Sequence, residues 1–146
     1  MGFWSSIFGG KGSDNSKPTP QDSDNAGRFV SEKGFQENLY KQSVMSPMTL
    51  EQLRQYDVTD DTVLKLEFFF YSNSEENAAR LTEELKALGY DAEYGPSQDD
   101  GVMIISGWTT GMAMSEAVVV EWTQMMCRRG YDHDCELDGW GTNPKQ

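Results

Sequence analysis

The hydrophobic pattern between residues 64 and 138 constrains the fold most, because it switches repeatedly between a strand-like and a helix-like period. Residues Leu64 to Tyr71 (LKLEFFFY) alternate in the manner of a strand with one buried face. A capping box follows at residues 72–75, and the next apolar residues stand at helical spacing up to Gly89, which predicts a helix that ends there. These apolar positions are Ala78, Leu81, Leu85 and Leu88.

The rest of this segment repeats the alternation. Residues 91–94 and 102–108 have the composition of strands, residues 112–128 that of a helix ending at Gly130, and residues 131–138 that of a last strand. A short internal repeat supports two related halves of the domain, since the glycine and tyrosine at 89–90 recur at 130–131. The order strand–helix–strand–strand–helix–strand predicts an α+β fold of the ferredoxin-like βαββαβ type. Such a fold has a four-stranded antiparallel sheet with two helices on one face.

Three regions precede or make up this fold. Residues 1–27 are predicted to be a disordered tether, because they contain Gly, Ser, Asp, Asn and Pro and little apolar surface beyond a short apolar segment at 1–8. Residues 28–48 are predicted to be a helical extension that Pro47 interrupts, and residues 49–143 the main domain. This domain is expected to begin with a short helix at 49–56, capped by Thr49.

All of the net charge of −12 lies in the later region. Residues 1–48 hold five of the 12 basic and five of the 24 acidic side chains, so residues 49–146 hold the remaining seven and 19. An acidic surface repels nucleic acid, whose binding depends on Lys and Arg, and attracts a basic protein. The charge therefore predicts a protein partner and no direct binding of nucleic acid, although acidity that only keeps the domain in solution is an open alternative.

The cysteine content and hydropathy predict a cytoplasmic protein. Only Cys127 and Cys135 occur, and there is neither a secretory leader pattern nor a run of 18 apolar residues. His133 is the one histidine, and no second histidine or cysteine pair completes a four-ligand metal site. No nucleophile motif or phosphate-binding loop is present either. We therefore expect a protein without enzymatic activity, metal or other cofactor.

The predicted partner-binding residues lie on two strands. If Leu64, Leu66, Phe68 and Phe70 face the core, the alternate positions Glu67, Phe69 and Tyr71 face outward. In the last strand the acidic positions share the outward parity, which predicts a row of four carboxylates on the same face of the sheet. These are Asp132, Asp134, Glu136 and Asp138. Such a face suits a cationic protein surface, because Arg stacks on rings and pairs with carboxylates. The alternative is that Phe69 and Tyr71 pack beneath the N-terminal helices.

The sequence Asp138-Gly-Trp-Gly-Thr142 at the end of the last strand resembles the regulator of ribonuclease activity B family. The segment from 66 to 91 and the central VMIISGW strand also fit that family, so the resemblance covers about residues 49–143. It implies a ferredoxin-like domain that binds ribonuclease E, or a similar basic RNA-handling protein, and inhibits it without cutting RNA. With the acidic face, the loop around Trp140 would then contact the partner. An adaptor or immunity protein with a different partner is the alternative.

Overall fold

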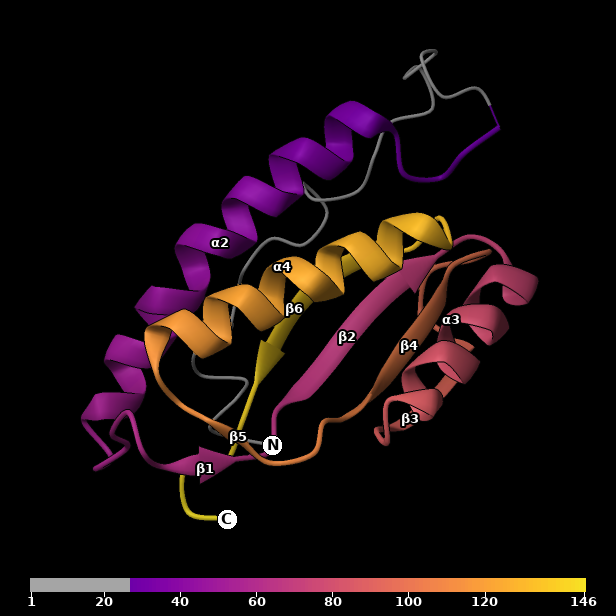
Figure 1. The fold of residues 1–146 in the computed structure, drawn as a ribbon. Coiled ribbons are helices and arrows are strands. Elements are labelled where there is room, and N and C mark those ends of the chain that lie inside the picture. The colour runs from indigo at the N-terminus through magenta and orange to yellow at the C-terminus, as the bar shows by residue number, and fades with distance from the viewer. Residues whose placement is uncertain (1–26) are drawn as a thin grey trace.

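A computed structural model describes residues 27–146 of the chain. The first helix is α2 (Glu32–Arg54), followed by strands β1 (Val63–Leu64) and β2 (Glu67–Ser72) and helix α3 (Glu75–Ala87). Strands β3 (Asp91–Pro96), β4 (Met103–Trp108) and β5 (Met112–Ala113), helix α4 (Glu116–Asp132) and strand β6 (Glu136–Gly141) complete the fold. Figure 1 shows α3 and α4 on the same side of the main sheet, with α2 beside α4.

The main sheet has four antiparallel strands in the order β3-β4-β2-β6, and β1 and β5 form a separate two-stranded sheet. Numbered within the βαββαβ unit, this order is 2-3-1-4, which is the ferredoxin-like arrangement. The predicted α+β fold is confirmed. Each helix connects a strand to another that is not its neighbour, so both helices come to lie over one face and bury it.

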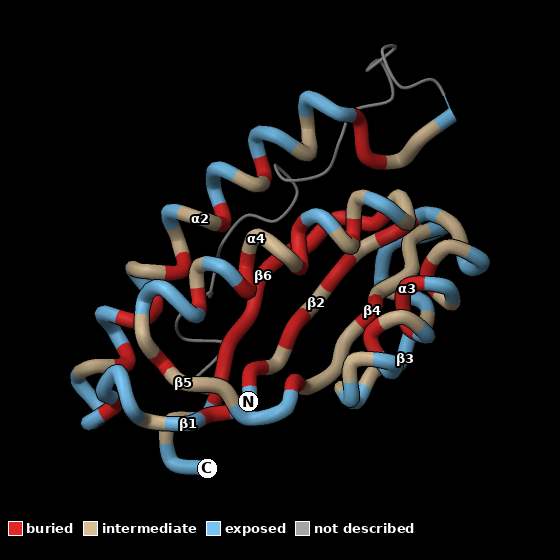
Figure 2. Tube along the Cα trace, viewed as in Figure 1, coloured by how far each residue is buried: buried red, intermediate tan, exposed pale blue. Residues whose placement is uncertain are grey.

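The core forms between that face of the sheet and the helices. Leu64, Leu66, Phe68 and Phe70 are all at most 3% exposed, as their alternation predicts. Figure 2 shows this buried track along β2 and β6. The expected single strand 64–71 is divided, however. Leu66 donates its amide to the Thr109 hydroxyl, and its carbonyl accepts from the Thr109 amide, so the chain leaves β1 and enters β2 around this point.

Helix α2 contradicts the prediction of two helices separated at Pro47. It is continuous from Glu32 to Arg54, with Ser31 as the N-cap, and Thr49 lies buried inside it. A proline within a helix removes one backbone hydrogen bond and costs about 3 kcal/mol. The helix persists because its last two turns bury Leu50 and Leu53 in the core, and burial of two leucines offsets a cost of that size.

The predicted last strand, 131–138, is also wrong in its first half. Helix α4 continues through Gly130 to Asp132, and the chain reverses at Asp134, which has a φ of 59°. Gly130 does not end the helix. A Cβ at this position would lie 2.9 Å from the Cys135 carbonyl oxygen, so glycine permits the chain to fold back closely. The two glycines of the internal repeat are therefore not equivalent, because Gly89 follows its helix with a φ of 90° whereas Gly130 lies inside α4.

No helix within residues 27–146 is long and apolar enough to cross a membrane. The predicted tether and the apolar segment at 1–8 lie outside the described residues, apart from Gly27.

Candidate partner-binding face

The face of the main sheet that points away from α3 and α4, here called the outer face, is the candidate site. Directly paired residues of antiparallel strands project to the same side. Phe68 and Phe70 of β2 face the core, so the alternate residues of β2 and their partners on the other strands form the outer face. They are Glu67, Phe69 and Tyr71 of β2, Ile104, Ser106 and Trp108 of β4, Asp91, Glu93 and Gly95 of β3, and Glu136, Gly139 and Gly141 of β6.

Three of the predicted residues, Glu67, Phe69 and Tyr71, are brought together here and are half-buried. Across β4 they pair with Trp108, Ser106 and Ile104. On the β6 side, Gly139 lies opposite Phe69 and Gly141 lies opposite Glu67. Small residues therefore flank the Phe69 ring on both sides. The two glycines of the Asp-Gly-Trp-Gly-Thr motif are themselves buried.

Two predicted carboxylates, Glu136 and Asp138, also belong to this region. Glu136 pairs directly with Tyr71 across the strands. Asp138 is the extra residue of a bulge, because Phe70 pairs with Leu137 while Phe69 pairs with Gly139. Both carboxyl groups are buried, at 5% and 6% exposed. Glu136 and Asp138 were predicted to lie on this side of the sheet, but they were expected to be exposed and are buried.

The burial of Glu136 has a marked electrostatic consequence. Desolvation, opposed by Lys41 and assisted by the nearby Asp138, raises the pKa of its carboxyl to about 8. Among the described residues its Oε1 atom has no hydrogen-bond partner. Partial burial and the Asp138 carboxylate also raise the pKa of Tyr71. The Glu136 carboxyl is therefore largely protonated at neutral pH, and its Oε1 atom can accept a hydrogen bond from a donor.

Asp132 and Asp134 do not lie on the outer face, which corrects the predicted row of four carboxylates. Asp132 is exposed at the end of α4. Asp134 sits in the turn before β6 and accepts hydrogen bonds from the amides of Phe29 at 2.9 Å and Val30 at 2.8 Å. Its carboxylate also lies 3.5 Å from Nε of Arg28. Asp134 therefore fixes the chain that enters α2.

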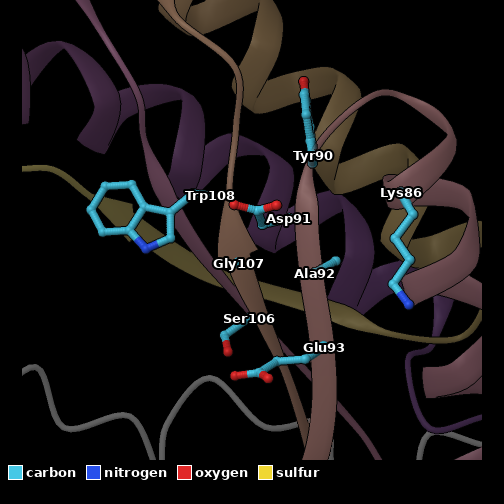
Figure 3. A pocket seen from close by; sticks show the side chains of 8 residues that line it. All are labelled: Lys86, Tyr90, Asp91, Ala92, Glu93, Ser106, Gly107 and Trp108. Atoms are coloured by element: carbon cyan, nitrogen blue, oxygen red, sulfur yellow. The ribbon is translucent and has the colours of Figure 1, made fainter.

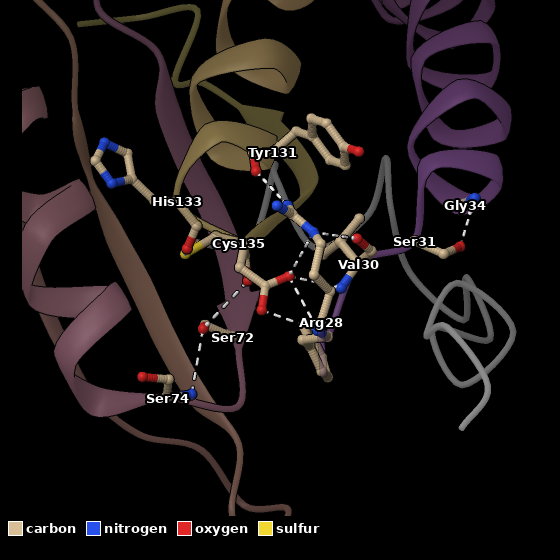
Figure 4. Close-up of polar contacts among 11 residues, drawn as sticks. Arg28, Val30, Ser31, Gly34, Ser72, Ser74, Tyr131, His133 and Cys135 are labelled. Carbon is tan, nitrogen blue, oxygen red and sulfur yellow. Dashed lines mark hydrogen bonds and ion pairs between the residues drawn. The ribbon is translucent and has the colours of Figure 1, made fainter. Parts of the chain in front are cut away.

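Arg28 also attaches the chain before α2 to the end of α4. Its guanidinium lies 4.3 Å from the centre of the Tyr131 ring and donates to the Tyr131 carbonyl at 2.5 Å. Figure 4 shows the guanidinium beside the Tyr131 ring, with Ser31 and Gly34 starting α2 close by. We call the contacts of residues 28–30 with Tyr131 and Asp134 the clasp. The sequence did not indicate the clasp, because Arg28 was predicted to belong to the helical extension at 28–48.

Trp140 is not available to a partner, which corrects its expected role in a binding loop. Its side chain is 1% exposed and packs edge-on against Trp122, with ring centres 6.3 Å apart. Its indole N–H donates to the Ser46 hydroxyl at 2.9 Å. Trp140 therefore joins β6 to both α4 and α2 in the core.

Helix α2 covers the outer edge of β6. An edge strand presents unpaired backbone groups, which proteins commonly cover. The Asn38 amide donates to the Leu137 carbonyl at 2.9 Å, and Gln42 donates to the Asp138 carbonyl at 3.1 Å. The sequence signal was present but was missed: two amide side chains four residues apart lie on one side of a helix.

The profile described as Regulator of ribonuclease activity B matches residues 46–142. This stretch is more than half of the 146 residues. The chain belongs to the regulator of ribonuclease activity B family. A search of curated proteins found no match.

The regulator of ribonuclease activity B domain begins within α2, at the residue that bonds Trp140. Its last matched residue, Thr142, donates its hydroxyl to the Lys65 carbonyl at 2.6 Å. The family match therefore includes the hydrogen bond between Ser46 and Trp140 but not the first half of α2, with Asn38 and Gln42, or residues 28–30 of the clasp. Membership assigns the chain to a family of regulators of ribonuclease activity.

A hollow of about 450 Å³ extends the outer face of this regulator domain to the edge strand β3. Its lining includes Asp91, Glu93 and Trp108 from the outer face and Lys86 of α3. Figure 3 shows Glu93 and Ser106 pointing to the side opposite Ala92. Trp108 was not among the predicted site residues, although it stands at the alternate position of a predicted strand, as Tyr71 does.

The histidine and the cysteines of the domain lie in structural surroundings. His133 contacts Glu84 at 2.6 Å, and Arg129 pairs with the same carboxylate, so these groups join α3 to the end of α4. Cys127 and Cys135 are buried as free thiols, and desolvation raises the pKa of each to about 12. A thiol with so high a pKa is a poor nucleophile at neutral pH. Within residues 27–146 no cluster of three potential metal ligands occurs.

Proposed function

We propose that this protein binds an endoribonuclease of the ribonuclease E type through its outer face and lowers the activity of that enzyme without catalysing a reaction itself. Membership of the regulator of ribonuclease activity B family supports the class of target. The aromatic rings and carboxylates that share the outer face support this face as the surface that contacts the enzyme. Rings supply apolar contact area, and carboxylates pair with the Arg and Lys of an RNA-binding enzyme.

The charge distribution supports the same partner. Residues 49–146 carry all of the net charge of −12, and an RNA-binding enzyme presents basic surface where it holds phosphates. Complementary charge accelerates association and makes it sensitive to salt. We place the interaction in the cytoplasm, and the two free thiols support a reducing compartment.

The experiment measures binding of the full-length protein to a purified ribonuclease E-type enzyme by calorimetry, together with the cleavage rate of an RNA substrate. Two matched charge reversals locate the surface. Glu93→Lys changes an exposed residue of the outer face, and Glu121→Lys makes the same change at an exposed residue of α4. We expect Glu93→Lys to weaken binding roughly tenfold, about 1.4 kcal/mol, and Glu121→Lys to have a much smaller effect.

The outcomes separate the parts of the proposal. Absence of binding at low salt would refute the ribonuclease as the target. Equal weakening by the two substitutions would retain the ribonuclease but reject the outer face as the contact. Degradation of RNA by the purified protein alone would contradict a non-catalytic role.

A further inference from the structure

We infer that the exposed edge of β3 binds an extended, basic segment of the protein partner as an additional antiparallel strand, with arginine or lysine at alternate positions facing Asp91 and Glu93. In such strand addition, backbone hydrogen bonds supply affinity and alternate side chains supply specificity. The inference rests on the proposed function for the source of the segment, which is the basic partner. The pairing itself is tested without that partner.

The two edges of the main sheet differ in how they are covered. β6 is the last strand on one side, and the side-chain amides of Asn38 and Gln42 in α2 donate to its carbonyl groups. β3 is the last strand on the other side, and Figure 1 shows it at the end of the sheet away from α2. Among residues 27–146 no strand pairs with the outward side of β3. An uncovered edge strand presents a row of backbone donors and acceptors to another chain.

The register of the sheet identifies the backbone groups that point outward from β3. In the hairpin after β3, Ser97 donates its amide to the Val102 carbonyl at 2.9 Å. Hydrogen-bonded and non-bonded pairs alternate along an antiparallel ladder, so the odd positions 91–95 bond to β4. The N–H and C=O groups of Ala92 and Tyr94, here called the open edge, therefore point away from β4. In the described part of the chain neither amide has a hydrogen-bond partner, and Tyr94 is 37% exposed.

The side chains beside the open edge favour a basic segment. Asp91 and Glu93 are exposed, and their side chains belong to the outer face. Trp108 lies directly opposite Asp91 on β4, and all three residues line the hollow of about 450 Å³ (Figure 3). An arginine of an added strand can pair with a carboxylate and stack on the Trp108 ring. Lys86 also lines the hollow, but its ammonium group pairs with Glu83 at 3.5 Å.

A second copy of this chain fits the open edge less well than a basic strand does. Antiparallel pairing of two β3 strands centred on Ala92 would place Asp91 of each copy opposite Glu93 of the other. Pairing centred on Glu93 would bring the two Glu93 carboxylates opposite each other, and like charges in such positions are destabilising. Pairing centred on Tyr94 would place Pro96, which has no N–H, opposite Ala92 and lose a hydrogen bond.

The test uses the full-length protein and a seven-residue synthetic peptide in which threonine and arginine alternate. Directly opposed residues of antiparallel strands project to the same side, so arginines that face the carboxylates leave the threonine N–H groups to bond the open edge. We expect the peptide to bind at low salt. At a free peptide concentration of roughly ten times the Kd, it should slow hydrogen exchange of the Ala92 and Tyr94 amides about tenfold. N-methylation of the threonine N–H groups should abolish this protection, whereas N-methylation of the arginine N–H groups should preserve it.

Two substitutions at one position separate the backbone from the side chain. Tyr94→Pro removes the outward N–H, and an edge strand tolerates proline at this parity, as Pro96 shows two residues later. Tyr94→Thr removes the same ring and keeps the N–H. We expect Tyr94→Pro to weaken peptide binding about fivefold more than Tyr94→Thr does, the factor that one hydrogen bond contributes. Asp91→Asn/Glu93→Gln should weaken it roughly fivefold, and Glu121→Gln, at an exposed carboxylate of α4, should leave it unchanged.

Three results would overturn the inference. The first is no binding of the peptide at low salt, and the second is binding without protection of the Ala92 and Tyr94 amides. The third is an equal loss of binding with the two N-methylated peptides, which act on the native chain and so do not depend on the folding of a variant. None of these measurements includes a ribonuclease. Their failure leaves the enzyme free to bind through the side chains of the outer face, and failure of the enzyme to bind leaves the strand pairing to the peptide test.

Discussion

The clasp at Asp134 provides the sharpest test of how the chain before α2 is held. The Asp134 carboxylate accepts from two backbone amides, those of Phe29 and Val30, and pairs with Arg28. Its backbone also adopts a φ of 59°, which Asp tolerates better than Ala does. Substitution by Ala therefore removes the acceptors and adds backbone strain, whereas substitution by Asn keeps one acceptor oxygen and the tolerance for this φ.

The magnitudes follow from the groups lost. Two hydrogen bonds to a charged group contribute roughly 1.5 kcal/mol each at the lower end of the usual range. The left-handed conformation costs Ala about 1 kcal/mol. We expect Asp134→Ala to lower the free energy of unfolding by roughly 3–4 kcal/mol, and Asp134→Asn by about 1–2 kcal/mol, since Asn retains one oxygen acceptor.

The assay is urea denaturation followed by far-ultraviolet circular dichroism, with Asp132→Ala as the control. Asp132 is exposed, two residues away in sequence, and outside the clasp, so its substitution should change the free energy of unfolding by less than about 0.5 kcal/mol. Hydrogen exchange should locate the loss of protection in the first turns of α2. A destabilisation below about 1 kcal/mol for Asp134→Ala, or equal effects of Asp134→Ala and Asp132→Ala, would refute the clasp as a stabilising element.

Three further predictions concern the core and the outer face. The pKa of Glu136 is raised from about 4.5 to about 8, so the native state binds this proton more tightly. The associated stability is fully present below about pH 4.5 and lost as pH rises through 8. Glu136→Gln should flatten that slope in a pH series of melts and add roughly 1–3 kcal/mol at pH 9. Ser46→Ala should cost roughly 1–3 kcal/mol in urea denaturation, because the buried Trp140 indole loses its acceptor. Gly130→Ala should destabilise by about 1–3 kcal/mol in the same assay, since its Cβ would meet the Cys135 carbonyl oxygen, whereas helix propensity alone predicts a gain of about 1 kcal/mol.

The ferredoxin-like order was predictable because it depends on local periodicity. The alternation of β2 and the spacing of Leu81 and Leu85 are each set by one buried face, and the burial of these residues agrees with the pattern. The errors lie where local signals competed with packing. Pro47 and Gly130 both indicate a helix end, yet both lie inside helices, because packing of α2 on the core and close approach of Cys135 outweigh those signals.

The candidate site was predictable in part for the same reason. Glu67, Phe69 and Tyr71 do share the outer side of the sheet, because alternation along one strand determines which side they face. The last strand was predicted to start five residues too early, and Asp132 and Asp134 were therefore assigned to a face that they do not reach. Parity along a strand has no meaning for residues that belong to a helix or a turn.

By itself, the sequence determined the class of fold, the acidic balance of residues 49–146 and the family, because composition, periodicity and a short motif are local properties of the chain. Only the tertiary structure decided which acidic residues share a surface. Asp134 holds the start of α2, while Glu136 and Asp138 are buried beside Tyr71. The physical reason is that pairing register, the bulge at Asp138 and the cover of α2 over β6 depend on contacts between residues far apart in the sequence, such as Tyr71 with Glu136 and Asn38 with Leu137.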